Sequence, residues 1–216
     1  MTEKTDRLLK IVSLLERDVK KYTPPLIDLL IEKYGKDPFL ILIATLLSLR
    51  SRDIVTWIVV QELFLHAKTA EQLVNLERSV LEKIVFKTGF YRQKAATLQH
   101  VAKEILDRFH DIVPADKALL ISITGVGLKT ANLVLGMAFD QPAICVDVHV
   151  HRISNRLGLI KTKTVEETEQ VLEKLLPKHL WIPWNNLIVV WGQNVCLPRN
   201  PKCNQCSLQP HCDQNI

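Results

Sequence analysis

Hydrophobic residues recur along the chain at the three- and four-residue spacing of amphipathic α-helices. Two such faces are formed by Leu8, Ile11, Val12 and Leu15, and by Leu98, Val101 and Ile105. Short breaks that contain proline or glycine separate the apolar segments, and no Asn-Gly or Asp-Gly dipeptide marks a β-hairpin. The pattern therefore predicts an all-α protein of about ten helices with short connections.

The breaks mark the places where the predicted helices end. They lie at Thr23-Pro24-Pro25, Gly35-Lys36-Asp37-Pro38, Val113-Pro114 and Gln141-Pro142. No Gly/Ser-rich linker interrupts the chain, so any two lobes must pack closely. After Trp191, three prolines exclude a long helix, and we expect the cysteines to organise this last stretch.

The longest apolar run, residues 39–49, is too short to cross a membrane and contains Thr45 and Ser48. A membrane-spanning helix needs about 20 apolar residues. The first residues alternate in charge and lack the apolar centre of a secretory signal. We therefore expect a cytoplasmic protein with no membrane association.

The composition is that of a globular protein. Of the 216 residues, 47% are hydrophobic and 24% are charged, which excludes a low-complexity disordered chain. The net charge of +5 at pH 7 suits a polyanionic partner such as nucleic acid, and it suits many ordinary enzymes equally. Charge alone therefore leaves the function open.

Four of the five cysteines lie within the last 21 residues, at Cys196, Cys203, Cys206 and Cys212. An odd number of cysteines in a chain without a secretory signal disfavours a disulfide framework. The spacing C-x6-C-x2-C-x5-C contains one close pair, whereas structural zinc sites usually contain two. Wide outer gaps suit a larger object such as an iron–sulfur cube. The segment predicts a metal centre, with an iron–sulfur cluster favoured over zinc and over four free surface thiols.

A Gly-x-Gly turn is the second feature that points to chemistry. Gly125, Val126 and Gly127 separate a helix predicted over 116–123 from one that begins near Leu128. Glycine permits positive φ and close approach to another chain, and the second helix presents free N–H groups to an anion such as a phosphate. The turn does not match G-x-G-x-x-G, which disfavours a dinucleotide fold. A plain connection between two helices stays the alternative.

Lys129 lies in the first turn of the second helix, where the helix dipole disfavours a cation. If the site is also partly buried, the amine loses hydration and becomes a nucleophile near neutral pH. The alternative is a lysine that contacts only phosphate or solvent.

Asp147 lies in the apolar stretch from Ile144 to Val150. It is placed to cap the helix that follows. An ionised carboxylate there could also stabilise positive charge that develops on a reacting sugar. Cys145 is most simply a small buried hydrophobic residue.

Together, three motifs resemble those of the endonuclease III branch of the helix-hairpin-helix DNA glycosylases. They are the hairpin sequence of residues 125–132, the sequence Val146-Asp147-Val148-His149, and the four-cysteine segment. Any one of them could occur by chance, but all three in this order are highly specific. The resemblance covers nearly the whole chain.

The resemblance implies a two-lobed all-α fold with a C-terminal [4Fe-4S] cluster loop. Residues 31–141 would form a helical barrel domain with the helix-hairpin-helix motif at about 116–135. Residues 1–30 and 142–216 would form a second helical domain around the cluster. The four cysteines of the loop 196–212 would be the cluster ligands.

The resemblance also implies a base excision repair enzyme, a DNA glycosylase with AP lyase activity that removes oxidised pyrimidines from double-stranded DNA. The damaged nucleotide must leave the base stack before its C1′ can be reached. Lys129 matches the family's catalytic lysine, which would attack C1′, expel the base and form a Schiff base that leads to β-elimination. Asp147 matches the catalytic aspartate, which would stabilise the cationic sugar or help to deprotonate the lysine. The related adenine glycosylases of mismatched DNA usually lack the lysine, so its presence favours a bifunctional enzyme.

Three loops would bind DNA by the same resemblance. The first is the hairpin turn Gly125-Val126-Gly127. Residues 47–53 match the loop that probes the gap left by the extruded nucleotide, with Arg50 where glutamine is common. Residues 88–95 match the loop whose apolar residue wedges into the duplex, which would be Phe90. Without the resemblance, Arg50 would be a solvated surface charge and Phe90 a core aromatic.

Arg50 is the departure from the family's pattern that matters most. An arginine fork can bind guanine O6 and N7, so we expect lesions opposite guanine to be preferred. Thr124 replaces the usual proline before the turn, and Val148 replaces the threonine after the aspartate. The second change removes a hydroxyl beside Asp147.

Three alternatives stay open. One is a glycosylase of the same family for thymine or uracil mispaired with guanine; the others are an iron–sulfur electron carrier and a non-catalytic DNA-binding protein. Arg199 and Lys202, between the first two cysteines, could reach phosphates if the cluster supports a DNA-contacting loop, with redox signalling as its alternative role. We expect a monomer. The sequence identifies neither the preferred lesion nor any protein partner.

Overall fold

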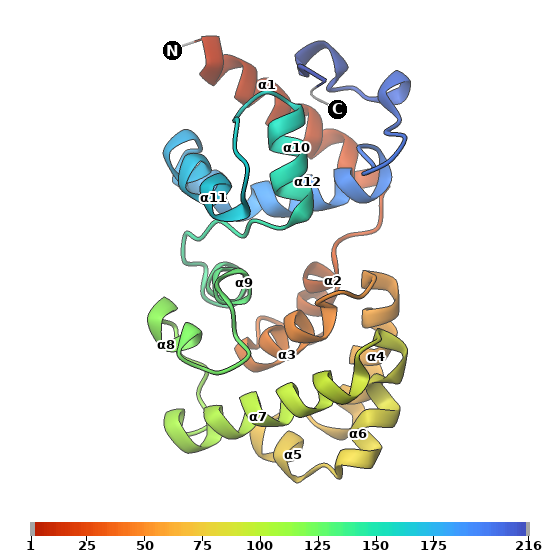
Figure 1. Cartoon of the computed structure of the whole chain (residues 1–216), viewed down its shortest axis with the longest axis vertical. Helices are drawn as coiled ribbons and strands as arrows, with labels where there is room; N and C mark the ends of the chain where they lie inside the picture. Colours follow the sequence, from red (N-terminus) through yellow and green to blue (C-terminus); the bar gives the residue numbers. More distant parts are fainter. Residues whose placement is uncertain (1–2, 215–216) are drawn as a thin grey trace. The chain divides into compact units, whose positions relative to one another are not determined.

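The computed structural model describes residues 3–214, and every regular element in this range is a helix. It contains twelve α-helices and five short 3-10 helices (Figure 1). The all-α class predicted from the hydrophobic pattern is confirmed. Each predicted break falls between two helices, because proline and glycine end the hydrogen-bond ladder there.

The chain divides into two compact units, Met1–Pro25 with Pro142–Ile216 and Leu26–Gln141. The second division coincides with the expected boundary at residue 141. The expected boundary at residue 30 falls inside helix α2 (Leu26–Tyr34). This helix packs against α3 (Pro38–Ser48) and α4 (Asp53–His66) of the unit Leu26–Gln141, which we call the second unit. Whether the units are separate folding domains stays a prediction.

The unit Leu26–Gln141 is built around one largely apolar helix. Its elements are α2, α3 (Pro38–Ser48), α4 (Asp53–His66), α5 (Ala70–Asn75), α6 (Arg78–Val85), η2 (Phe86–Thr88), α7 (Tyr91–Phe109), α8 (Lys117–Ile121) and α9 (Leu128–Phe139). Every residue from Phe39 to Leu47 of α3 is buried, because α2, α4, α7 and α9 all pack against this helix. A helix that is hydrophobic all round is stable only in such a setting.

The start of α3 follows from two adjacent residues. Pro38 occupies the first turn, where its missing N–H is not needed. The Asp37 carboxylate accepts a hydrogen bond from Leu40 N at 2.9 Å and caps the helix.

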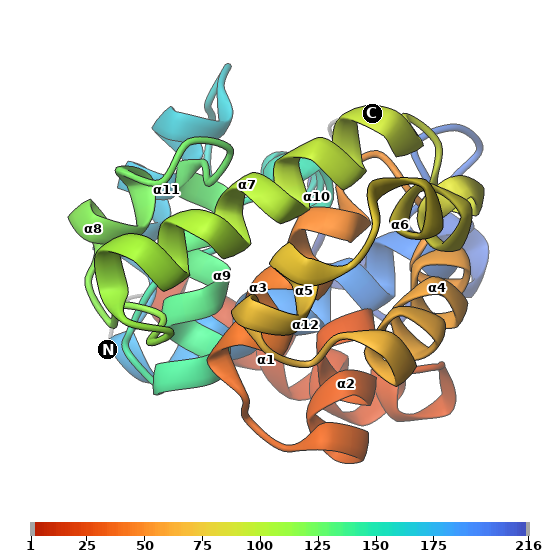
Figure 2. The same cartoon turned by 90° about the horizontal axis from the view of Figure 1, so that it is seen from below.

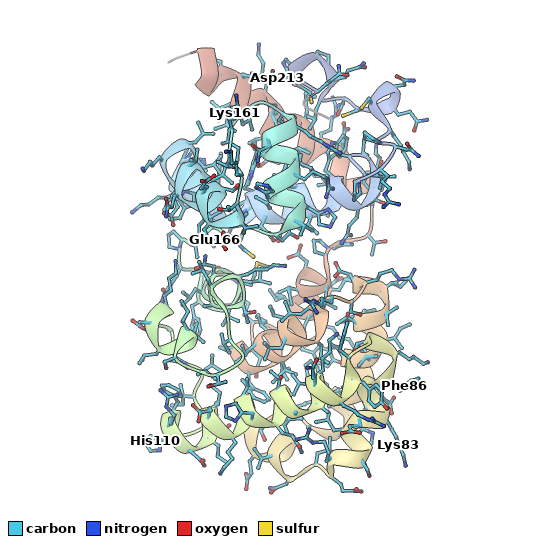
Figure 3. All side chains as sticks on the ribbon, viewed as in Figure 1. Lys83, Phe86, His110, Lys161, Glu166 and Asp213 are labelled. Carbon is cyan, nitrogen blue, oxygen red and sulfur yellow. The ribbon has the colours of Figure 1, made fainter. Side chains whose placement is uncertain are left out.

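Helix α7 is the longest of the second unit, and it packs against α5 and α6 (Figure 2). The predicted face of Leu98, Val101 and Ile105 is buried. Figure 3 labels Phe86 of η2, whose ring contacts that of Tyr91 at the beginning of α7, and His110, which directly follows the end of α7. The two ends of α7 therefore border two different loops of the same unit.

The other unit contains α1 (Glu3–Asp18), η1 (Val19–Lys21), α10 (Val148–Arg156), α11 (Val165–Leu175), η3 (Lys178–Leu180), α12 (Trp181–Asn194), η4 (Cys203–Gln205) and η5 (Gln209–His211). Its core includes two tryptophans of α12, Trp184 and Trp191, each 1% exposed. The predicted face of α1 packs into this core, and all four of its residues are buried. Helix α12 thus joins α1 and α10, which are remote in sequence.

Arg7 of α1 ties the first helix to the end of the chain. Its guanidinium donates to the Leu157 and His211 carbonyl oxygens and pairs with Asp213 at 2.6 Å, which Figure 3 labels. None of the helices in residues 3–214 is long and apolar enough to cross a membrane.

Candidate functional site

The predicted helix, turn and second helix are present as α8, residues 122–127 and α9. Gly125 has a φ of +101°, a backbone conformation that residues with a side chain rarely adopt. A Cβ at this position would lie 2.8 Å from Cγ2 of Thr97 in α7. Both the backbone conformation and the neighbouring helix therefore require glycine here.

Gly127 is a different kind of glycine. It is the N-cap residue of α9, with an ordinary φ of −89°, and a Cβ there would meet no atom within 4 Å. No side chain caps this helix end. Its N-terminal N–H groups and positive dipole end can therefore be approached closely, as anion binding requires.

Val126, between the two glycines, is 4% exposed, and its N–H donates to the Ile123 carbonyl oxygen at 3.0 Å. Its side chain thus anchors the turn in the core.

Lys129 is the second residue of α9, as predicted, and its side chain is exposed. The sequence analysis made the loss of hydration of the Lys129 amine conditional on partial burial, and this structure does not show that burial. The position near the helix N-terminus remains, and there the dipole opposes a cation.

Asp147 caps α10, as expected. Its Oδ1 accepts hydrogen bonds from His149 N at 2.9 Å and from Val150 N at 2.8 Å. The side chain is partly buried, and capping does not use its Oδ2. Asp147 belongs to the unit Met1–Pro25 with Pro142–Ile216, and Lys129 belongs to the other.

Two arginines of α10 hold the beginning of the cysteine segment. Arg152 donates to the Cys196 carbonyl oxygen at 2.8 Å. Arg156 donates to the carbonyl oxygens of Leu197 at 2.7 Å and Pro198 at 2.9 Å. The helix that Asp147 caps is therefore also the support of the cysteine segment.

The four C-terminal cysteines line one pocket, together with Trp191 and Leu208. All four are partly buried, and burial raises the pKa of the Cys206 and Cys212 thiols. Among the described residues, no three His, Cys, Asp or Glu side chains are grouped tightly enough to hold a single metal ion. Four thiols around a common space are a donor set that suits soft metals, including iron with sulfide.

The fifth cysteine lies elsewhere. Cys145 is 3% exposed, and its carbonyl oxygen accepts a hydrogen bond from Asn185 Nδ2 at 2.9 Å. The expectation that it is a buried residue is confirmed.

Arg50 and Phe90 lie beside each other although 40 positions separate them. The Arg50 guanidinium lies over the Phe90 ring, with its Cζ 5.5 Å from the ring centre. Both residues have left-handed backbone conformations, with φ of 57° and 48°. Phe90 is 59% exposed, so the alternative of an ordinary core aromatic is wrong.

Three residues near these sites were missed by the sequence analysis. Lys94 donates to two backbone carbonyl oxygens beside Arg50 and Phe90, and Arg152 and Arg156 hold the cysteine segment. The two arginines are four residues apart, the spacing of one helix face, which was a usable signal. Nothing in the local sequence marks Lys94.

Comparison with known proteins identifies the family. Residues 43–178 match the HhH-GPD superfamily of base excision DNA repair proteins. Endonuclease III of Thermotoga maritima is 44% identical over 177 residues, which is 82% of this chain and 83% of that protein. The chloroplastic endonuclease III homolog 2 of Arabidopsis thaliana is 38% identical, and the chain spans 47% of that longer protein.

Solved structures agree. A non-covalent complex of endonuclease III with DNA contains a chain that is 30% identical to this one, with a TM-score of 0.86. The match covers 99% of this chain and 97% of the other. The predicted helix-hairpin-helix glycosylase fold is thereby confirmed.

The contrast between the two glycines can be tested by unfolding in urea. Gly125→Ala is expected to cost about 1–3 kcal/mol, because it strains the backbone and brings a Cβ against Thr97. Gly127→Ala should cost less, about 0.5–1 kcal/mol, because it meets no neighbouring atom and loses only the preference for glycine over alanine at an N-cap. Adding Thr97→Ser, which removes Cγ2, should restore part of the Gly125→Ala loss. Equal losses from the two glycine substitutions would contradict this account of the turn.

Proposed function

The chain belongs to the HhH-GPD superfamily of base excision DNA repair proteins, as an endonuclease III-like DNA glycosylase and AP lyase, and we propose that Lys129 is its nucleophile. The observation that carries this proposal is the position of Lys129 in the first turn of α9, two residues after the open helix end at Gly127. A phosphate bound to that end would bring a sugar close to the amine. We propose oxidised pyrimidines in double-stranded DNA as the substrates.

In the proposed reaction, the neutral amine of Lys129 attacks C1′ of the extruded nucleotide. The glycosidic bond breaks, and the base leaves with the bonding electron pair and takes up a proton. The sugar ring then opens to a Schiff base between C1′ and Nζ. Loss of a C2′ proton and cleavage of the C3′–O bond release the 3′ side of the strand, which carries a 5′-phosphate. Water then hydrolyses the Schiff base and frees the amine.

The exposure of Lys129 bears on how its amine is prepared for attack. Since the Lys129 side chain is exposed, we propose that the bound nucleotide removes water from the amine before attack. Loss of hydration disfavours the ammonium form and leaves the lone pair available.

Asp147 would stabilise the cationic sugar and assist in deprotonating the amine. Its Oδ1 accepts two hydrogen bonds from backbone N–H groups of α10. The cap also fixes the direction of the side chain, since both bonds fall on Oδ1.

The remaining DNA contacts are proposed on exposure and charge. The backbone at Gly127 would bind a phosphate, while Arg50 and Phe90 would enter the space left by the extruded nucleotide. Arg199 and Lys202 are both exposed and would contact phosphates.

The four-cysteine pocket is proposed to hold a [4Fe-4S] cluster with Cys196, Cys203, Cys206 and Cys212 as ligands. Bound there, the cluster would form one iron–sulfur bond with each of the four cysteines and so cross-link the segment. The regular structure of residues 196–212 consists of two short 3-10 helices, so this cross-linking would stabilise it. Arg152 and Arg156 hold the beginning of the segment against α10, so their contacts carry the support to the helix capped by Asp147.

Borohydride trapping on DNA with an abasic site tests the nucleophile. Lys129→Ala is expected to abolish the covalent cross-link, because no other amine is assigned to C1′, while the Kd for duplex DNA changes by less than about threefold. Lys117→Ala is the matched control, since Lys117 is exposed at the start of α8 in the same hairpin, and it should keep the cross-link. Undiminished trapping by Lys129→Ala would remove this residue from the proposed role.

Substitution of Asp147 separates its charge from its capping role. Asparagine caps helices as well as aspartate does, so Asp147→Asn should keep the stability within about 0.5 kcal/mol. Its single-turnover rate of base removal is expected to fall by about 10²–10⁴. Asp147→Ala should show the same fall in the rate of base removal and should also lose about 1 kcal/mol of stability. A normal rate in Asp147→Asn would leave the residue as a cap only.

Elemental analysis of the purified protein tests the metal centre. We expect about four iron and four acid-labile sulfide per chain, and Cys203→Ser should lose both together with thermal stability. Cys145→Ala is the control that should keep them, because Cys145 lies outside the pocket. A finding of about one zinc per chain and no sulfide would contradict the cluster and indicate a zinc site instead.

A further inference from the structure

Helix α3 ends with carbonyl groups that no later turn of the helix can satisfy. The Leu47 carbonyl oxygen, one residue before the end, accepts a hydrogen bond from Lys94 Nζ at 2.7 Å. The ammonium of a residue 47 positions away therefore closes the C-terminal end of the most buried helix of the unit, where the helix dipole favours a cation.

The same ammonium closes a second helix end. Lys94 Nζ also donates to the carbonyl oxygen of Thr88, the last residue of η2, at 3.0 Å. The backbone N–H of Lys94 donates to the Phe90 carbonyl oxygen at 2.9 Å. One residue thus holds the chain before and after the turn at Gly89.

The Lys94 side chain is partly buried, and burial lowers its pKa to about 8. At neutral pH most molecules still carry the charge, and a charged donor makes the stronger hydrogen bonds. Lys94 also lines a surface pocket together with Arg50, Phe90 and Thr97.

Each of the two helix ends that Lys94 contacts, those of α3 and η2, is followed closely by a residue with a strained backbone conformation. Arg50 follows the end of α3 by two positions, and Phe90 follows the end of η2 by two. Left-handed conformations at residues other than glycine persist only where their surroundings hold them. The side chains that result are in contact, with the guanidinium over the ring.

We propose that Lys94 is a positioning residue that holds Arg50 and Phe90 in the paired arrangement needed to extrude the damaged nucleotide. The inference rests on the proposed function of that pair. Extrusion requires breaking base stacking and base pairing, so it depends on side chains that are correctly placed before they enter the duplex. An abasic site has no base to remove from the stack, and strand cleavage there depends less on the pair.

The test compares two reactions of the full-length protein. Lys94→Met should lower the single-turnover rate of base removal from a lesion-containing duplex by at least about tenfold. Strand cleavage at a preformed abasic site should fall by less than about threefold. Lys103→Met is the matched control, because Lys103 is exposed on the same helix and pairs with Asp107, and it should leave both rates within about twofold.

Two further measurements separate positioning from other roles. In a chain that already carries Arg50→Ala and Phe90→Ala, adding Lys94→Met should lower base removal by less than about twofold, because the pair it acts through is gone. The slope of log Kd against log salt should not change, whereas a direct phosphate contact would reduce it by about one. Lys94→Gln keeps a shorter, neutral donor and should show the same selective loss to a smaller extent, which provides the test if Lys94→Met does not fold.

A parallel fall of both rates, full additivity with the Arg50 and Phe90 substitutions, or a reduced salt slope would each overturn the inference. These outcomes differ from a failure of the proposed function. In that case the unsubstituted protein itself would neither remove bases nor form the cross-link through Lys129.

Discussion

The close contact between the hairpin turn and α7 is the constraint on which the candidate site depends. Thr97 occupies the space that a side chain at residue 125 would need, and the positive φ of Gly125 turns the chain there. That turn determines where α9 begins, and thereby places both the open end at Gly127 and the amine of Lys129. A small change in α7 packing would move the proposed phosphate site and the proposed nucleophile together.

The two proposed catalytic residues stand at helix N-termini for opposite reasons. Asp147 is favoured there, because its carboxylate satisfies two N–H groups and its charge matches the dipole. Lys129 has the wrong charge for the first turn of α9. The capping bonds explain Asp147 without any reaction, whereas the dipole of α9 disfavours a cation at residue 129. This asymmetry makes the lysine the more informative of the two.

Much of this could be predicted from sequence because it is local. Helix periodicity, proline breaks and the cap at Asp147 depend on neighbours within four residues. The pairing of Arg50 with Phe90 and the double contact of Lys94 depend on how α3, η2 and α7 pack, so no local pattern contains them. The exposure of Lys129 was missed for the same reason, since burial is a property of the folded chain.

An exposed nucleophile cannot by itself distinguish a damaged nucleotide from a normal one. As the proposed nucleophile, exposed Lys129 would react with any sugar that reaches it, so selectivity would arise in the steps that bring a nucleotide out of the duplex. The residues suited to those steps are the stacked, strained and exposed pair of Arg50 and Phe90. Because the Arg50 and Phe90 side chains face solvent, their positions have to be fixed by the backbone on which they stand. Two carbonyl groups held by one partly buried ammonium provide such a foundation, which links recognition to the core of the same unit.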